Sequence, residues 1–142
     1  MKILIVCTGN TCRSQMAEGF LKSLNKNLEV YSAGTSPEGS INPRAVKVMQ
    51  EKGIDISNGT PESVDKYINI PFDYVITVCD GAKEKCPVFI GKVKHRLHIG
   101  FDDPAQARGS EKKIMETFRR VRDEIFRDFT KFYTLNIKPL QQ

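Results

Sequence analysis

The chain has 142 residues, of which 39% are hydrophobic and 27% are charged, and its formal net charge is +5 at pH 7. That length fits one domain with a core of its own, and no apolar run approaches the roughly 18 residues of a membrane-spanning helix. The apolar start is too short for a secretory signal, so we expect a cytoplasmic protein without membrane contact. No RNA- or DNA-binding motif accompanies the basic excess, which favours a solvated surface over a nucleic-acid partner.

Apolar runs alternate with stretches of helical periodicity along the chain. Strands are predicted at four places: 2–7, 28–33, 72–78 and within 92–99. Helices are predicted at 14–24, at 42–53, from Thr60 as a cap to 67, and from 110 to about 133. Strands separated by helices favour parallel pairing through right-handed crossovers, and hence an open three-layer α/β sheet. We expect one domain, 1–142, with 134–142 as a candidate flexible tail.

Three reactive stretches follow the ends of predicted strands. Cys7 ends the first strand, Cys79 follows the third, and Asp102 and Asp103 follow the fourth. The carboxyl ends of parallel strands meet at one edge of a sheet, where α/β proteins bind ligands. These side chains are therefore expected to lie along the same edge.

The stretch CTGNTCRS, residues 7–14, joins the first strand to the first helix. Its backbone N–H groups would surround one point at the amino end of the helix, where the helix dipole favours negative charge. Gly9 permits the tight curvature, and the planar guanidinium of Arg13 can bind two oxygens of one anion. We predict a cradle for a tetrahedral oxyanion, formed by Thr8, Gly9, Asn10, Thr11, Cys12, Arg13 and Ser14.

The same positive field acts on the sulfur of Cys7. Helix N-termini and arginines lower the pKa of a cysteine from about 8.5 to between roughly 3.5 and 7.5, so no histidine is needed to form a thiolate. Ser14 can hydrogen-bond to that thiolate, and Asn10 can bond across the loop to fix its shape. Cys12 is either a bystander, which we favour, or a second redox group.

The loop CTGNTCRSQMAEG resembles the phosphate-binding loop of the low-molecular-weight protein tyrosine phosphatase family, and in particular of its thioredoxin-coupled arsenate reductase branch. The resemblance extends to about residue 134 through YSAGT, NPRAV, DISN, TVCDGAKEKCP, GFDDPA and FRRVRDEI. It implies a four-stranded parallel sheet in the order 2-1-3-4 with helices on both faces. It also implies arsenate as substrate, phosphate and sulfate as competing oxyanions, thioredoxin as reductant and no required cofactor.

Cys79 and Cys86 distinguish the two activities of this family. A phosphatase needs one thiolate and a proton donor, whereas reduction of arsenate to arsenite takes two electrons, which two further thiols can supply as a disulfide. In the reductase branch, the residues that match this pair carry oxidation away from the loop, which implies a relay from Cys7 to Cys79 and Cys86. Zinc is a weaker alternative, because two cysteines without a nearby histidine make a poor ligand set.

The resemblance also assigns a proton donor and a cation site. The family places its general acid directly before a proline, which selects Asp103 over Asp102. Some members of the reductase branch bind an alkali cation, potassium or sodium, and the matching positions here are Asn10, Glu18, Ser32 and Glu62. The family has aspartate at the last of these positions.

The sequence therefore predicts an arsenate reductase with Cys7 as nucleophile and weak phosphatase activity on the same fold. Two alternatives stay open. A phosphotyrosine or other phosphomonoester phosphatase would use Cys7, Arg13 and Asp103, and both Cys79 and Cys86 would be dispensable. A non-catalytic anion sensor or redox-regulated interaction module would behave the same after Cys7→Ser.

Overall fold

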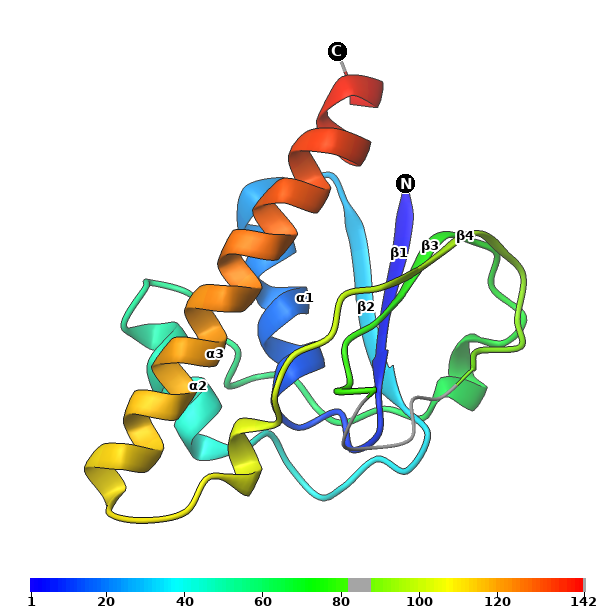
Figure 1. Cartoon of the computed structure of the whole chain (residues 1–142). Coiled ribbons are helices and arrows are strands. Elements are labelled where there is room, and N and C mark those ends of the chain that lie inside the picture. Colours follow the sequence, from blue (N-terminus) through cyan, green and yellow to red (C-terminus); the bar gives the residue numbers. More distant parts are fainter. Residues whose placement is uncertain (82–87, 142) are drawn as a thin grey trace.

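The computed structural model describes residues 1–81 and 88–141 and contains one parallel sheet (Figure 1). Its strands pair in the order β2-β1-β3-β4, which confirms the predicted order. The strands are β1 (Lys2–Cys7), β2 (Glu29–Gly34), β3 (Phe72–Thr77) and β4 (Val93–His98). The central strand β1 is fully buried from Ile3 to Val6, as its unbroken apolar run predicts.

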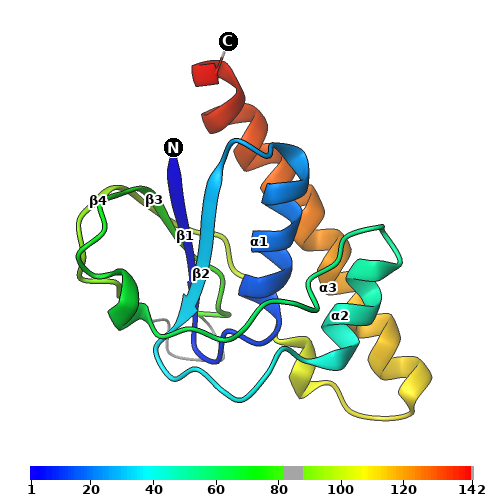
Figure 2. The ribbon, with the colours of Figure 1, turned by 180° about the vertical axis from the view of Figure 1, so that it is seen from behind.

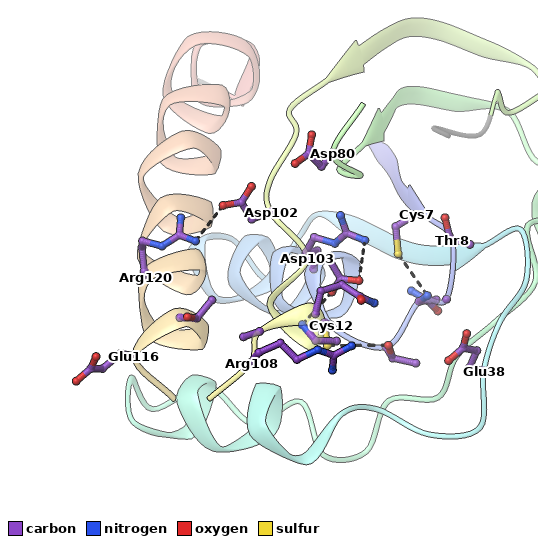
Figure 3. A pocket seen from close by; sticks show the side chains of 18 of the residues that line it. Cys7, Thr8, Cys12, Glu38, Asp80, Asp102, Asp103, Arg108, Glu116 and Arg120 are labelled. Atoms are coloured by element: carbon purple, nitrogen blue, oxygen red, sulfur yellow. Dashed lines mark hydrogen bonds and ion pairs between the residues drawn. The ribbon is translucent and has the colours of Figure 1, made fainter. Parts of the chain in front are cut away.

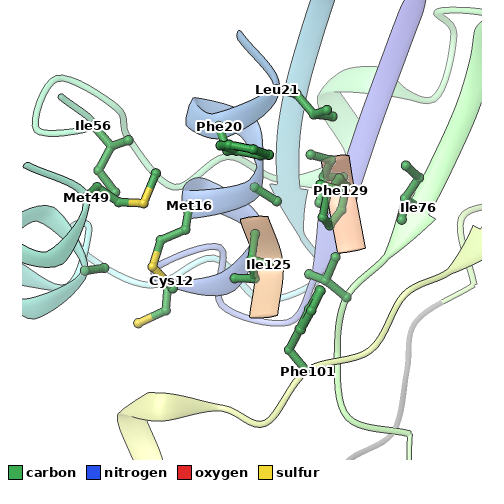
Figure 4. Packing of buried hydrophobic residues seen from close by; sticks show 14 of the residues in the cluster. Cys12, Met16, Phe20, Leu21, Met49, Ile56, Ile76, Phe101, Ile125 and Phe129 are labelled. Carbon is green, nitrogen blue, oxygen red and sulfur yellow. The ribbon is translucent and has the colours of Figure 1, made fainter. Parts of the chain in front are cut away.

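Helices cover the two faces of the sheet unequally. Three α-helices pack on one face, as both views of the ribbon show (Figures 1 and 2): α1 (Arg13–Leu24), α2 (Pro43–Gln50) and α3 (Glu111–Phe132). Figure 4 shows side chains of this layer, among them Phe20 from α1 and Ile125 and Phe129 from α3. The opposite face is covered by the short 3₁₀ helix η1 (Val64–Tyr67) and by Phe89, which contacts Phe72.

The helix ends follow their sequence signals. Asn42 caps α2 by accepting a hydrogen bond from the N–H of Arg44 at 2.9 Å, and Ser110 caps α3 through the N–H of Lys113 at 3.2 Å. A further 3₁₀ turn, η2 (Pro104–Gln106), lies between β4 and α3. No helix in the described part of the chain is long and apolar enough to cross a membrane.

The predicted helix that begins at Thr60 is wrong. The segment stays irregular until η1, whose cap is Ser63, the acceptor of a hydrogen bond from the N–H of Asp65 at 3.2 Å. Pro61 would suit the first position of a helix, as Pro43 does in α2, so the local sequence does not account for the difference. The backbone of this segment is instead hydrogen-bonded to two side chains: the carbonyl of Thr60 accepts from Gln15 on α1, and the N–H of Glu62 donates to Asn10 of the loop.

Residues 134–141 of the segment 134–142, a candidate flexible tail in the sequence, continue the last helix. A π-helical turn, η3 (Tyr133–Ile137), follows α3 directly and leads into the 3₁₀ turn η4 (Lys138–Gln141). Ile137 is fully buried in the same core as α1 and α3. The apolar contact of Ile137 thus holds η3 against the domain.

A pair of arginines on α3 holds the end of α2. Arg122 is buried and donates to the carbonyl of Val48 at 3.0 Å and to Glu51 at 2.8 Å, and Arg119 donates to the other carboxylate oxygen of Glu51 at 2.9 Å. The hydrogen bond from Arg119, and after it that from Arg122, lowers the pKa of Glu51 from 4.5 to about 2. The charged form of Glu51 therefore stabilises the fold.

We predict that Glu51→Gln lowers the free energy of unfolding at pH 7 by about 1 kcal/mol, because solvent screens a carboxylate that is 33% exposed. A pKa that is depressed by folding gives stability that is complete above the unfolded value of 4.5 and disappears as the pH falls to about 2. The difference between wild type and variant should therefore shrink over that range in urea titrations.

The control is Glu111→Gln, because Arg44 and Glu111 form a second arginine–glutamate pair between α2 and α3. Glu111 is 65% exposed, so its loss should have a much smaller effect. Equal effects of the two variants, or a difference that does not depend on pH, would contradict this assignment.

Candidate active site

A pocket of about 1110 Å³ opens at the carboxyl ends of the strands. It is lined by residues 7–13, by Asp80, by Asp102 and Asp103, and by the first turns of α3 (Figure 3). The structure thus brings the loop and the two aspartates together at one edge of the sheet. Cys79 is fully buried directly before Asp80, beside the pocket rather than on its wall.

The carbonyl groups of the loop point outward, to the segment 35–42. Four backbone hydrogen bonds hold them there: Thr35 N–H to Cys7 (3.2 Å), Ser36 to Thr8 (3.0 Å), Glu38 to Gly9 (3.1 Å) and Asn42 to Thr11 (3.0 Å). In a trans peptide the C=O of one residue and the N–H of the next point in opposite directions, and no peptide bond in the described part of the chain is cis. The N–H groups that follow these carbonyls are therefore turned inward, as a cradle for an oxyanion requires.

Asn10 organises the centre of the loop. Its backbone has a left-handed conformation, with φ of +57°, and its N–H donates to the sulfur of Cys7 at 3.3 Å. Its side-chain oxygen accepts from the N–H of Glu62 at 2.9 Å, so its NH₂ group faces the hydroxyls of Ser14 (2.7 Å) and Ser32 (3.0 Å). Because Ser14 accepts from Asn10, its own proton is free for the sulfur of Cys7, 3.0 Å away. Two donors thus stabilise negative charge on that sulfur.

Arg13 is the first residue of α1, and its buried guanidinium is held by contacts with the segment that follows β4. One nitrogen donates to the carbonyl of Phe101 at 3.1 Å, and another lies 3.7 Å from a carboxylate oxygen of Asp103. Arg13 also lines the pocket, so its positive charge lies beside the inward N–H groups. The contact with Phe101 ties the loop to the segment that follows β4.

The two adjacent aspartates have different partners. Asp103 faces Arg13, and its other oxygen accepts from the N–H of Ala105 at 3.0 Å, which caps η2. Asp102 turns to α3 and pairs with Arg120 at 2.9 Å. Asp103 is therefore the carboxyl that lies next to the cradle, which is the position that a proton donor needs.

Cys12 is buried within the loop and differs chemically from Cys7. Burial, and after it the charge of Asp103, raises the pKa of Cys12 to about 12. The thiol is therefore protonated at neutral pH and a poor nucleophile. This property favours the interpretation of Cys12 as a bystander.

Cys79 is disulfide-bonded, whereas Cys7 and Cys12 are free thiols. Its predicted partner in the relay, Cys86, lies outside the described residues. The backbone of Cys79 packs against Gly100, where a Cβ atom would come within 2.9 Å of the Cys79 carbonyl oxygen. This close approach holds Cys79 against the segment that leads to the two aspartates.

The oxygens at the alkali-cation positions are already engaged. Ser32 donates to one oxygen of Glu18 at 2.6 Å, and Lys22 binds the other at 2.6 Å. The carboxylate of Glu62 lies 3.4 Å from Lys66. The oxygen of the fourth position, Asn10, accepts two hydrogen bonds, from the N–H of Glu62 and from the side chain of Gln15. Each side chain of this donor set thus already has a hydrogen-bond or ion-pair partner. In the described part of the chain, no group of three or more His, Cys, Asp or Glu side chains could hold a metal.

Two parts of the site were not predicted from the sequence. The segment 35–42 was not assigned a role, although its N–H groups hold the loop carbonyls. Gln15 was also missed, and its signal is a polar residue directly before the buried residues Met16 and Ala17. Its contacts span up to 45 positions of sequence, which a local pattern does not reveal.

The cysteine loop on a strand-to-helix turn, with an arginine at its end, defines a class of proteins by fold and site together. Residues 2–141 match the family described as low molecular weight phosphotyrosine protein phosphatase, and the chain belongs to this family.

Several curated relatives of the chain have names that are more specific than the family description. The chain is 52% identical to an arsenate reductase of Bacillus subtilis (strain 168) over 124 residues, which cover 87% of this chain and 88% of the relative. It is 50% identical to an arsenate reductase of Shouchella clausii (strain KSM-K16) over 131 residues, which cover 92% and 93% of the two chains. A solved structure of an arsenate reductase in the phosphate binding state is similar with a TM-score of 0.73 and 30% identity, over 94% of this chain and 96% of that one.

We predict that iodoacetamide at pH 7 modifies Cys7 and leaves Cys12 unmodified in the folded protein, because a pKa of about 12 leaves Cys12 almost no thiolate. Peptide mapping by mass spectrometry measures both sites in one sample. Cys12→Ala should change the alkylation rate of Cys7 less than about threefold, a small change on the scale of a lost hydrogen bond. Comparable labelling of both cysteines would contradict the assignment.

Proposed function

We propose that the protein is an arsenate reductase in which Cys7 attacks arsenate bound by Arg13 and the loop N–H groups. The observation that carries the proposal is the sulfur of Cys7 at the base of a cradle of inward N–H groups, with Ser14 and Asn10 as its donors. The arsenate reductases that share about half of its residues over most of both chains support the choice of substrate. Phosphate and sulfate have the same tetrahedral shape and should compete.

The first step forms a bond between sulfur and arsenic. The Cys7 thiolate attacks the arsenic atom of hydrogen arsenate, the bond from arsenic to the hydroxyl oxygen breaks, and this hydroxyl leaves as water with a proton from Asp103. Arg13 and the loop N–H groups bind the remaining oxygens, whose negative charge they stabilise throughout. Asp103 is beside Arg13 and the cradle, so a short proton transfer supports its role as the acid.

The second step is a reduction. The thiolate of Cys79 attacks the sulfur of Cys7, a disulfide forms, the sulfur–arsenic bond breaks, and its electron pair stays on arsenic, which leaves as arsenite. Cys86 then attacks Cys79, so that Cys7 is released as a thiolate and a Cys79–Cys86 disulfide remains. Thioredoxin supplies the two electrons and two protons that reduce this disulfide. The disulfide-bonded state of Cys79, with Cys7 free, supports a relay that moves oxidation away from the loop.

A phosphatase activity is the second candidate function. It is favoured by the same cradle, because Cys7, Arg13 and Asp103 are the groups that cleavage of a phosphomonoester needs. In the proposed reductase this activity would be a weak side reaction.

The assignment of the acid predicts different effects at the two aspartates. Asp103→Asn should slow formation of the Cys7 adduct by roughly 100- to 10,000-fold, the usual contribution of a general acid, without weakening the binding of sulfate. Asp102→Asn should have little effect, because Asp102 pairs with Arg120 on α3. Rapid-quench measurement of the adduct tests both variants, and a larger loss in Asp102→Asn would reverse the assignment.

The relay predicts a reductase that depends on Cys79 and Cys86 and a phosphatase that does not. Cys86→Ser should complete one turnover and stop as a Cys7–Cys79 disulfide, and Cys79→Ser should fail to release arsenite. The assay is arsenate-dependent oxidation of NADPH with thioredoxin and thioredoxin reductase, beside hydrolysis of a chromogenic phosphate ester as the control. Sustained turnover of arsenate by the Cys79→Ser, Cys86→Ser double variant would contradict the relay and favour the phosphatase.

A further inference from the structure

Gln15 is a buried polar side chain at the start of α1, only 4% exposed. Its NH₂ group donates to three oxygens: the carbonyl of Asn10 at 3.1 Å, the side-chain oxygen of Asn10 at 3.1 Å and the carbonyl of Thr60 at 3.2 Å. Gly59 leaves room for it, since a Cβ atom there would lie 2.9 Å from the side-chain oxygen of Gln15. One side chain thus joins the loop to the segment before η1.

The carbonyl of Asn10 points outward, like the other carbonyl groups of the loop. The carbonyls on either side of it, those of Gly9 and Thr11, are held by backbone N–H groups of the segment 35–42. The carbonyl of Asn10 is held instead by the side chain of Gln15. Asn10 also has a positive φ of +57°, a conformation that a residue with a side chain keeps when its surroundings hold it there.

We propose that Gln15 is a positioning residue that locks the Asn10–Thr11 peptide, so that the N–H of Thr11 stays directed at the bound oxyanion. The inference deepens the proposed function and rests on it for the identity of the ligand as a tetrahedral oxyanion. Gln15 itself does not line the pocket and acts through Asn10.

The first consequence concerns the affinity for oxyanions. When the carbonyl of Asn10 is held outward, the N–H of Thr11 on the same rigid peptide must point inward. Without Gln15 this peptide is free to turn, and a turned peptide presents a carbonyl dipole to the anion in place of a donor. Loss of Gln15 should therefore weaken the binding of phosphate, sulfate and arsenate alike.

The second consequence concerns the reactivity of Cys7. Gln15 and the N–H of Glu62 both donate to the side-chain oxygen of Asn10, which keeps its NH₂ group on Ser14. That contact leaves the hydroxyl proton of Ser14 for the sulfur of Cys7. Because Glu62 still donates when Gln15 is lost, we expect this effect to be smaller than the effect on oxyanion affinity.

The test is the reduced full-length protein with Gln15→Met, which keeps a side chain of similar length and removes the donors. Inorganic phosphate is the probe, and its affinity is measured by how well it protects Cys7 from iodoacetamide. The phosphate dissociation constant should rise about tenfold, as for one hydrogen bond to a charged group. Alkylation of Cys7 in the absence of phosphate should slow by a smaller factor.

Two further variants separate positioning from packing. Gln15→Glu keeps the shape of glutamine but replaces the NH₂ group, which donates to three oxygens, with a carboxylate oxygen that repels them. At pH 8 it should therefore weaken phosphate binding at least as much as Gln15→Met. Leu21→Ala removes a fully buried side chain of the same helix, and it should lower the melting temperature with phosphate affinity within twofold of wild type.

Wild-type phosphate affinity in Gln15→Met, near-normal binding in Gln15→Glu, or an equal loss in Leu21→Ala would overturn the role of Gln15 while leaving the proposed function intact. A wild-type protein that phosphate does not protect would contradict the cradle itself, and this inference with it.

Discussion

The site depends on the hydrogen bonds that hold the loop carbonyls outward. A peptide group is rigid, so each C=O fixed to the segment 35–42 fixes the next N–H on the other side of the loop. The segment that supplies these donors leaves β2 at Gly34, where a Cβ atom would come within 2.3 Å of the carbonyl oxygen of Thr8. Glycine at that position permits the close approach, and β2, the loop and α2 then form one frame around the anion site.

The same loop gives its two cysteines different chemistry. Cys7 receives donors from Ser14 and Asn10, whereas Cys12, five residues later, is buried beside the charge of Asp103 and has a pKa of about 12. Local environment, rather than distance along the chain, thus separates a sulfur with two hydrogen-bond donors from an inert thiol. Cys79 is distinct again, because it is bonded in a disulfide beside the pocket.

Charge around the pocket is divided between α1 and α3. Arg13 on α1 forms an ion pair with Asp103, and Arg120 on α3 forms one with Asp102. The two neighbouring carboxylates therefore face different helices of the pocket. Away from the pocket, Lys22 and Lys66 neutralise Glu18 and Glu62, the carboxylates that the family pattern assigns to a cation.

The sequence by itself determined what depends on neighbours along the chain: four strands, the capped helices, and a loop whose residues 7 to 14 are contiguous. Tertiary structure alone decided the rest. The helix predicted from Thr60 does not form there, because the backbone is hydrogen-bonded to distant side chains. Gln15 donates to the carbonyl of Thr60, 45 positions away, and Asn10 accepts from the N–H of Glu62, 52 positions away. The partners of the two aspartates likewise depend on which elements pack together, because Arg13 and Arg120 come from two different helices. Periodicity records which face of an element is buried, but not which polar group a distant segment brings to it.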